Sequence, residues 1–126
     1  MFKSEKYGSP SLTHQGVLVK SKAERILADY FTRKGIEYQY EPRIYAGKII
    51  HPDFYLPEHK VYVEYWGLVD APDDRTRTNY VKQMRWKRAQ YHSNKLQFIS
   101  IYPDNLRDLD RIFKSKFKKV TGSELH

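Results

Sequence analysis

Residues 52–67 read PDFYLPEHKVYVEYWG and contain two strand-like segments on either side of a tight turn. The segment from Val61 to Trp66 is rich in β-branched and aromatic residues and stops at Gly67, which is typical of a strand. Asp53 and Glu64 stand 11 residues apart, a separation that suits adjacent strands joined by a short turn. The pattern therefore predicts that both carboxylates lie side by side at one end of a sheet.

These two carboxylates stand in unusual places for purely structural residues. Aspartate is disfavoured in strands, and Glu64 is an isolated charge among apolar residues, where an unpaired carboxylate is costly to bury. A salt bridge would satisfy either residue alone. Two converging carboxylates, however, repel each other unless a divalent cation lies between them, and oxygen ligands suit Mg²⁺ or Mn²⁺. The pair thus predicts a metal site of the kind that activates water against a phosphate.

The flanking segments complete an α/β pattern. Ser21-Lys22-Ala23-Glu24 resembles a capping box at the start of a helix that stops at Gly35. The other expected elements alternate in type. They are strands over residues 36–40, 48–55, 61–66 and 96–101, and helices over 76–92 and 104–119, with Pro52 as a bend or edge in the second strand and Asp104 as the cap of the last helix.

This order predicts an α/β fold with a central mixed four-stranded sheet flanked by helices. We expect residues 1–16 to form a loose arm, residues 17–120 a single domain and residues 121–126 a tail.

Composition narrows the range of functions. The chain has 126 residues and no cysteine, which excludes a disulfide framework, a thiol nucleophile and a Cys-ligated metal. No apolar run approaches the roughly 18 residues of a membrane span, so we expect no membrane partner. The N-terminus MFKSEKYGSP lacks the features of a secretory signal. We therefore expect an intracellular protein, in the cytoplasm or nucleoid.

The charge is distributed unevenly along the chain. Residues 1–74 carry 10 basic and 11 acidic side chains, whereas residues 75–119 carry 13 basic and 3 acidic ones, and the net charge is +8. A solvated helix surface is one interpretation of such a run. An excess of one sign over this length also favours a nucleic-acid partner.

Three segments carry a resemblance to a known family. Ser21-Lys22-Ala23-Glu24-Arg25-Ile26, Pro52-Asp53-Phe54-Tyr55-Leu56-Pro57 and Val63-Glu64-Tyr65-Trp66-Gly67 resemble the PD-(D/E)XK nuclease superfamily. They are most similar to small nuclease domains related to very-short-patch-repair and helicase-associated endonucleases, and the likeness covers about residues 18–103.

The resemblance implies a fold and a set of roles. The fold is a restriction-endonuclease-like core in the order α-β-β-β-α-β, followed here by a C-terminal helix. Asp53 is then the central metal ligand and Glu64 the second carboxylate. The Tyr65 carbonyl completes the inner shell, and Glu24 approaches the metal from the first helix, where it can equally serve as a capping-box partner.

The sequence departs from the family motif at one position. The motif expects lysine two residues after Glu64, but Trp66 stands there. Some family members recruit this lysine from the following helix, where it stabilises charge developing on the phosphate. Lys87 is our choice, because it shares a helical stripe with Tyr80, Gln83 and Tyr91. Lys82 is the alternative. A third interpretation is that both lysines face solvent or contact the DNA backbone.

These expectations predict a Mg²⁺-dependent DNA endonuclease, structure-specific or relaxed in sequence and possibly a homodimer. Contacts to DNA are expected from residues in and next to the helix over 76–92. Arg75, Arg77, Lys82, Arg85 and Arg88 would bind phosphates, and Gln83 resembles a residue that in relatives points at the metal site or the scissile phosphate. The alternatives are a catalytically weak or inactive nuclease-fold subunit that binds DNA within a larger complex, and an RNA-binding basic domain. The missing lysine after Glu64 favours the first alternative, and the charge of Glu64 within an apolar strand argues against the second.

Overall fold

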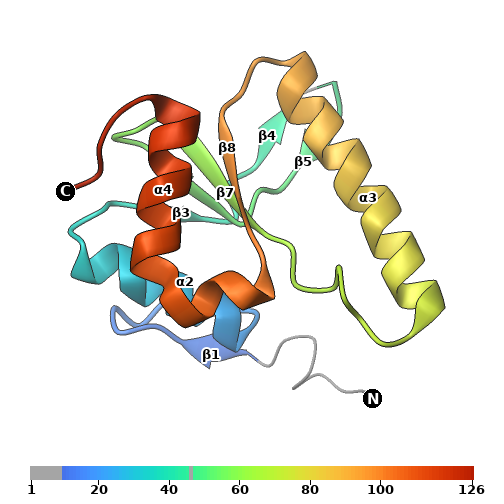
Figure 1. The fold of residues 1–126 in the computed structure, drawn as a ribbon, viewed down its shortest axis with the longest axis horizontal. Helices are drawn as coiled ribbons and strands as arrows, with labels where there is room; N and C mark the ends of the chain where they lie inside the picture. The colour runs from blue at the N-terminus through green and yellow to red at the C-terminus, as the bar shows by residue number, and fades with distance from the viewer. Residues whose placement is uncertain (1–9, 46) are drawn as a thin grey trace.

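The computed structural model describes residues 10–45 and 47–126. In this part of the chain, helices α2 (Lys22–Arg33), α3 (Asp74–Ser93) and α4 (Leu109–Thr121) surround a central sheet (Figure 1). The four strands of that sheet are β3 (Gln39–Tyr40), β6 (Phe54–Leu56), β7 (Val61–Tyr65) and β8 (Phe98–Ile101), in the order β3-β6-β7-β8. β3, β6 and β7 pair antiparallel, and β8 runs parallel to β7. The predicted α/β fold with a mixed four-stranded sheet is therefore confirmed.

One face of the sheet packs against α2 and α4. The Ser21 side chain accepts a hydrogen bond from the Glu24 amide, and Gly35, with φ +68°, follows the last turn of the helix, as the sequence predicts. The two helices and the strands share one aromatic core. Its buried members include Leu27, Phe31, Phe54, Val63, Ile99, Phe113 and Phe117.

The opposite face is covered only in part. Tyr91, near the C-terminal end of α3, packs with Ile50, Tyr62 and Phe98 in a second, smaller cluster. Tyr91 is the only buried residue among the 20 residues of α3, a helix that has no apolar stripe. Its N-terminal half stands away from the sheet (Figure 1). This arrangement leaves space between α3 and the end of β7.

The strand predicted over residues 48–55 is wrong, because it is two strands that bend apart at Pro52. β5 (Ile49–Ile50) pairs with β4 (Ile44–Tyr45) in a separate hairpin, and β6 alone joins the central sheet. Proline has no backbone N–H to donate to a ladder, so the segment leaves one sheet and enters another there. The predicted strand 36–40 shortens to β3, since the Ile36 amide donates to the Phe31 carbonyl at the end of α2, at 2.8 Å, rather than to a strand.

The N-terminal segment and the start of the last helix differ from expectation. Within the expected arm, residues 1–9 lie outside the described part, but β1 (Ser11–Leu12) pairs with β2 (Leu18–Val19), so residues 11–16 belong to an ordered hairpin. The last helix begins as a 3₁₀ turn, η1 (Pro103–Asp108), before α4. Its N-cap is Tyr102 rather than Asp104, because Pro103 supplies the first helical position. No helix in the described residues is both long enough and apolar enough to cross a membrane.

Two substitutions in α2 test this core. Phe31 is fully buried and makes edge contacts with the rings of Tyr30, Phe54 and Phe113. Phe31→Ala should lower the free energy of unfolding by about 3–5 kcal/mol, measured by urea denaturation. Ile26→Ala, at a position 38% exposed in the same helix, should cost about 1 kcal/mol or less; equal losses in both variants would contradict the packing described.

Candidate active site

A cavity of about 700 Å³ lies between the start of α2, the C-terminal end of β7 and α3. Its polar lining comes from four segments that are distant in sequence. The side chains that matter most for chemistry are Lys20, Glu24, Asp53, Glu64, Gln83 and Lys87. Because these groups come from separate elements, the fold itself brings them together.

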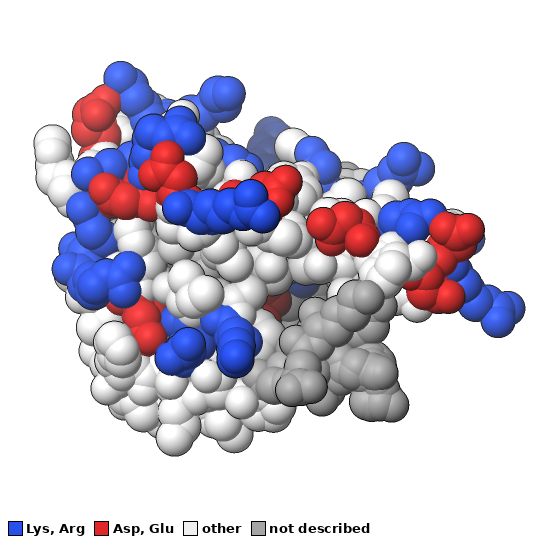
Figure 2. Space-filling view, turned by 60° about the horizontal axis from the view of Figure 1, so that its bottom comes forward, with Lys and Arg blue, Asp and Glu red and all other residues white. Residues whose placement is uncertain are grey.

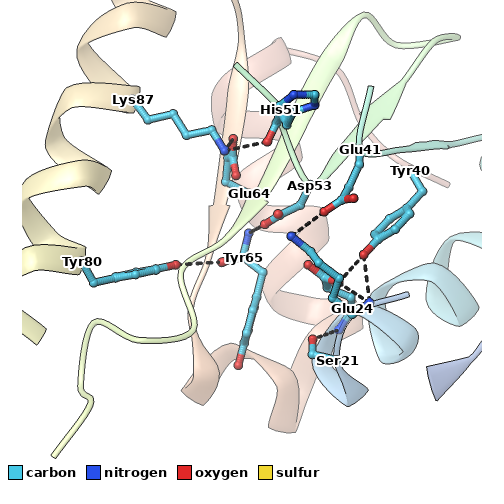
Figure 3. Close-up of polar contacts among 11 residues, drawn as sticks. Ser21, Glu24, Tyr40, Glu41, His51, Asp53, Glu64, Tyr65, Tyr80 and Lys87 are labelled. Atoms are coloured by element: carbon cyan, nitrogen blue, oxygen red, sulfur yellow. Dashed lines mark hydrogen bonds and ion pairs between the residues drawn. The ribbon is translucent and has the colours of Figure 1, made fainter. Parts of the chain in front are cut away.

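Asp53 lies directly before β6, and two hydrogen bonds fix its position. Its Oδ2 accepts a hydrogen bond from the Tyr65 amide at 2.6 Å, and its carbonyl accepts one from the Glu41 amide at 2.8 Å (Figure 3). The first bond links β6 to the end of β7, so Asp53 lies beside the segment that carries Glu64. The predicted neighbourhood of these two carboxylates is present.

Glu64 is 1% exposed and faces α3 from the middle of the sheet. Its Oε2 lies 2.8 Å from the Lys87 ammonium and accepts a hydrogen bond from the Tyr91 hydroxyl. Lys87 also donates to the His51 carbonyl at 2.9 Å. A buried charge needs a partner of opposite sign and further hydrogen bonds. Glu64 has both, so this carboxylate is fixed in the wall of the cavity.

The acidic groups act on one another. Burial, followed by the negative charge of Glu64, raises the pKa of Asp53 to about 7, although the Tyr65 amide and Lys87 oppose the shift. Burial likewise raises the pKa of Glu24, which the Asp53 charge raises further and the Tyr40 hydroxyl lowers. The order along the cavity is therefore Glu64, Asp53, Glu24, with repulsion between neighbours. Such a site favours a cation.

Each of these carboxylates has one oxygen in use and one available. Glu64 uses Oε2, Asp53 uses Oδ2 and Glu24 uses Oε1. Within residues 10–45 and 47–126, no hydrogen bond or ion pair reaches the second oxygen of any of the three. The described side chains do not come together as a preassembled group of three acidic or histidine ligands. A metal would therefore be held by few carboxylate oxygens, with water or a carbonyl completing its shell.

Of the two lysines that the sequence left open, one lies at the cavity and near Trp66. Lys87 reaches the cavity from α3, and its ammonium lies 5.9 Å from the centre of the Trp66 ring, the residue at the expected lysine position. Lys82 points elsewhere and lies with Arg77, Val81 and Arg85 around a second hollow on α3. Between the two lysines left open by the sequence, Lys87 is the one at the cavity.

The remaining predicted site residues divide into two groups. Tyr65 and Gln83 line the cavity, and the Tyr80 hydroxyl lies 3.4 Å from the Tyr65 carbonyl. The cavity lining does not include the expected phosphate contacts on the rest of α3, namely Arg75, Arg77, Lys82, Arg85 and Arg88.

Sequence reasoning overlooked the partners of the carboxylates. Tyr91 lies on the stripe of Tyr80, Gln83 and Lys87, which is the available signal, but the stripe does not predict a contact with Glu64. In the structure its ring stacks on Phe98 and its hydroxyl donates to Glu64. Tyr40 carried no signal, since its contact with Glu24 joins two elements that only the tertiary fold brings together.

Comparison of the chain with protein-family models, with curated proteins and with solved structures finds no match.

The raised pKa of Asp53 makes stability depend on pH. Between about pH 4 and 7 the folded protein holds a proton that the unfolded chain releases, so this residue lowers stability as pH rises through that window. Asp53→Asn stays neutral and can still accept from the Tyr65 amide. The free energy of unfolding of this variant minus that of wild type should be larger at pH 8 than at pH 5, by on the order of 2 kcal/mol in metal-free urea titrations, because only wild type loses stability as pH rises. A difference that does not change with pH would contradict the electrostatic origin of the shift.

Proposed function

We propose that this chain is a Mg²⁺-dependent DNA endonuclease of the PD-(D/E)XK type, with a restriction-endonuclease-like core. One observation carries the proposal: Asp53 and Glu64 share a cavity with Lys87, and each carboxylate keeps one oxygen without a partner among the described residues. Two acidic ligands and a lysine at one end of a mixed sheet are groups that can hold a divalent cation and stabilise charge on a phosphate.

The residues present fit a hard divalent cation. The available donors are carboxylate oxygens and the Tyr65 carbonyl, which Mg²⁺ and Mn²⁺ prefer. Burial and then the Glu64 charge raise the pKa of Asp53, and a bound cation would offset both effects by stabilising the charged carboxylate. Asp53 and Glu64 would hold the ion, and Glu24 would approach it from α2. When bound, Mg²⁺ polarises a phosphate oxygen and makes hydroxide available from a coordinated water.

Lys87 supplies the positive charge that the motif lacks at Trp66. Its ion pair with Glu64 keeps the ammonium at the cavity wall, next to the acidic groups. From there it can stabilise the charge that develops on the scissile phosphate. The hydrogen bond to the His51 carbonyl orients the ammonium before substrate arrives.

The DNA surface proposed is α3 and its surroundings. No acidic residue occurs between Asp74 and Asp104, so the whole helix beyond its first residue is basic or neutral. Figure 2 shows Lys and Arg side chains at the right edge of the molecule, where α3 lies, with acidic side chains among them. Arg75, Arg77, Lys82, Arg85 and Arg88 would bind backbone phosphates and Gln83 would act at the cavity. Contacts of this kind position DNA without reading its sequence, which favours a structure-specific or relaxed nuclease, alone or as a homodimer, inside the cell.

A second candidate function follows from the same lysine. Lys87 is already paired with Glu64, and Trp66 fills the motif position. If the ion pair between Lys87 and Glu64 prevents Glu64 from binding a metal, the chain is a weak or inactive nuclease-fold subunit that binds DNA within a larger complex.

A cleavage panel separates the two candidates. Supercoiled plasmid, linear duplex, four-way junction, mismatched duplex and single strand are each incubated with Mg²⁺, Mn²⁺ or EDTA. We expect cutting that needs the metal and disappears in Asp53→Ala, because Asp53 is the central ligand. Metal should also raise the melting temperature of wild type and not that of Asp53→Asn, since only the former binds it. Tight DNA binding with no cutting of any substrate would favour the inactive subunit.

A lysine pair on α3 separates catalysis from binding. Lys87→Ala should lower the single-turnover cleavage rate on the order of 10²- to 10³-fold, because a charge next to the phosphate is lost. DNA affinity measured in EDTA should change little.

Lys82→Ala is the matched control on the same helix. It should weaken DNA binding and reduce the salt slope by about 1, with the rate at saturating DNA unchanged. A normal rate in Lys87→Ala, in protein that melts cooperatively, would remove Lys87 from the chemistry.

A further inference from the structure

Glu24 is held by a partner that helix capping does not require. Its Oε1 accepts hydrogen bonds from the Tyr40 hydroxyl at 2.7 Å and from the Lys20 amide at 3.0 Å. The Tyr40 oxygen in turn accepts from the same Lys20 amide at 2.9 Å. The three groups form one closed set of hydrogen bonds at the edge of the cavity (Figure 3).

The capping box explains only half of this arrangement. The Ser21 hydroxyl accepts from the Glu24 amide at 3.1 Å, as a capping box predicts. The reciprocal bond does not go to the Ser21 amide, because Glu24 turns to Lys20 and Tyr40 instead. Glu24 is 6% exposed, and a capping carboxylate at a helix start could stay in water. Its burial against Tyr40 therefore needs another reason.

Tyr40 links α2 to the segment that contains Asp53, directly before β6. It lies on β3 directly opposite Phe54, the neighbour of Asp53 on β6. The next residue, Glu41, donates its amide to the Asp53 carbonyl and pairs with the Lys20 ammonium at 2.5 Å. Glu41 takes a φ of +49°, a left-handed conformation that costs energy for a residue with a side chain. Tyr40 and Glu41, which are adjacent in sequence, thus connect the start of α2 to the backbone of Asp53.

We propose that Tyr40 is a positioning residue, which fixes one oxygen of Glu24 so that the other is presented to a divalent cation held by Asp53. This inference rests on the proposed function, since it names the group that sets one ligand of the same site. Burial and the Glu24 charge raise the pKa of Tyr40, so its hydroxyl keeps its proton and remains a donor. Partners of this kind orient metal ligands, and their loss costs about 10- to 100-fold in metal affinity or activity.

Tyr38, two residues before Tyr40, provides a matched control. The Tyr38 hydroxyl is also buried, but it has no hydrogen-bond partner among the described residues. Tyr38→Phe and Tyr40→Phe therefore make the same chemical change in the same segment, and only the second removes a bond to Glu24. Mn²⁺ binding is measured by calorimetry without DNA, and single-turnover cleavage is measured as a function of Mg²⁺ concentration.

We expect Tyr40→Phe to weaken Mn²⁺ binding and to raise the Mg²⁺ concentration for half-maximal cleavage by about tenfold or more. Its affinity for DNA in EDTA should stay unchanged, and Tyr38→Phe should match wild type in all three measurements. A purely structural role would lower the melting temperature of Tyr40→Phe and leave its metal requirement unchanged, which would overturn the proposal.

Two further variants keep the outcomes distinct. Glu24→Gln retains an oxygen acceptor for Tyr40 and Lys20 but removes the negative charge. This variant should therefore bind Mn²⁺ more weakly than wild type, a result that does not depend on how well Tyr40→Phe folds. Wild-type Mn²⁺ affinity in Glu24→Gln would also overturn the proposal. Asp53→Ala tests the site itself. Metal binding that is abolished in Asp53→Ala and intact in Tyr40→Phe would leave the nuclease standing and remove the role of Tyr40, whereas a wild type that binds no metal would remove both.

Discussion

The buried charge of Glu64 is the constraint on which the arrangement around the cavity depends. A carboxylate that is 1% exposed in the middle of a sheet must be paired, and both its partners, Lys87 and Tyr91, come from α3. That helix has no apolar stripe to attach it elsewhere, because Tyr91 is its only buried residue. The ion pair and the hydrogen bond therefore place α3 against the sheet and form one wall of the cavity.

A helix attached in this way has its other sides available for function. Apolar burial usually determines which residues a surface helix can carry, but on α3 one end makes most of the packing contacts. The remaining positions carry basic and neutral side chains without acidic ones after Asp74. The same feature that makes α3 a poor core helix makes it a suitable surface for a polyanion.

The carboxylates of the cavity show a conflict between stability and function. Asp53 lies near two other acidic groups, and its pKa is raised first by its burial and then by the negative charge of Glu64. Backbone amides, Lys87 and Tyr40 offset part of the repulsion between these acids but leave one oxygen of each acid without a partner in the described structure. A protein selected for stability alone would not gather these charges, and local conflicts of this kind are expected where a ligand is bound.

Local sequence determined the three long helices and three of the four central strands, but not the two small hairpins. The β-branched and aromatic residues of Val61–Tyr65, the capping box of α2 and the stripe of Tyr80, Gln83, Lys87 and Tyr91 all predicted elements that the structure contains, because each depends on neighbours close in the chain. The separation of Asp53 and Glu64 even predicted their proximity, since a short turn leaves adjacent strands little freedom.

Only the tertiary structure decided which partners these residues meet. The transfer of the chain between sheets at Pro52, the choice of Lys87 over Lys82 at the cavity and the contact of Tyr40 with Glu24 all join segments distant in sequence. Such contacts depend on how whole elements pack, and side-chain periodicity within one element carries no information about the element that will lie opposite it.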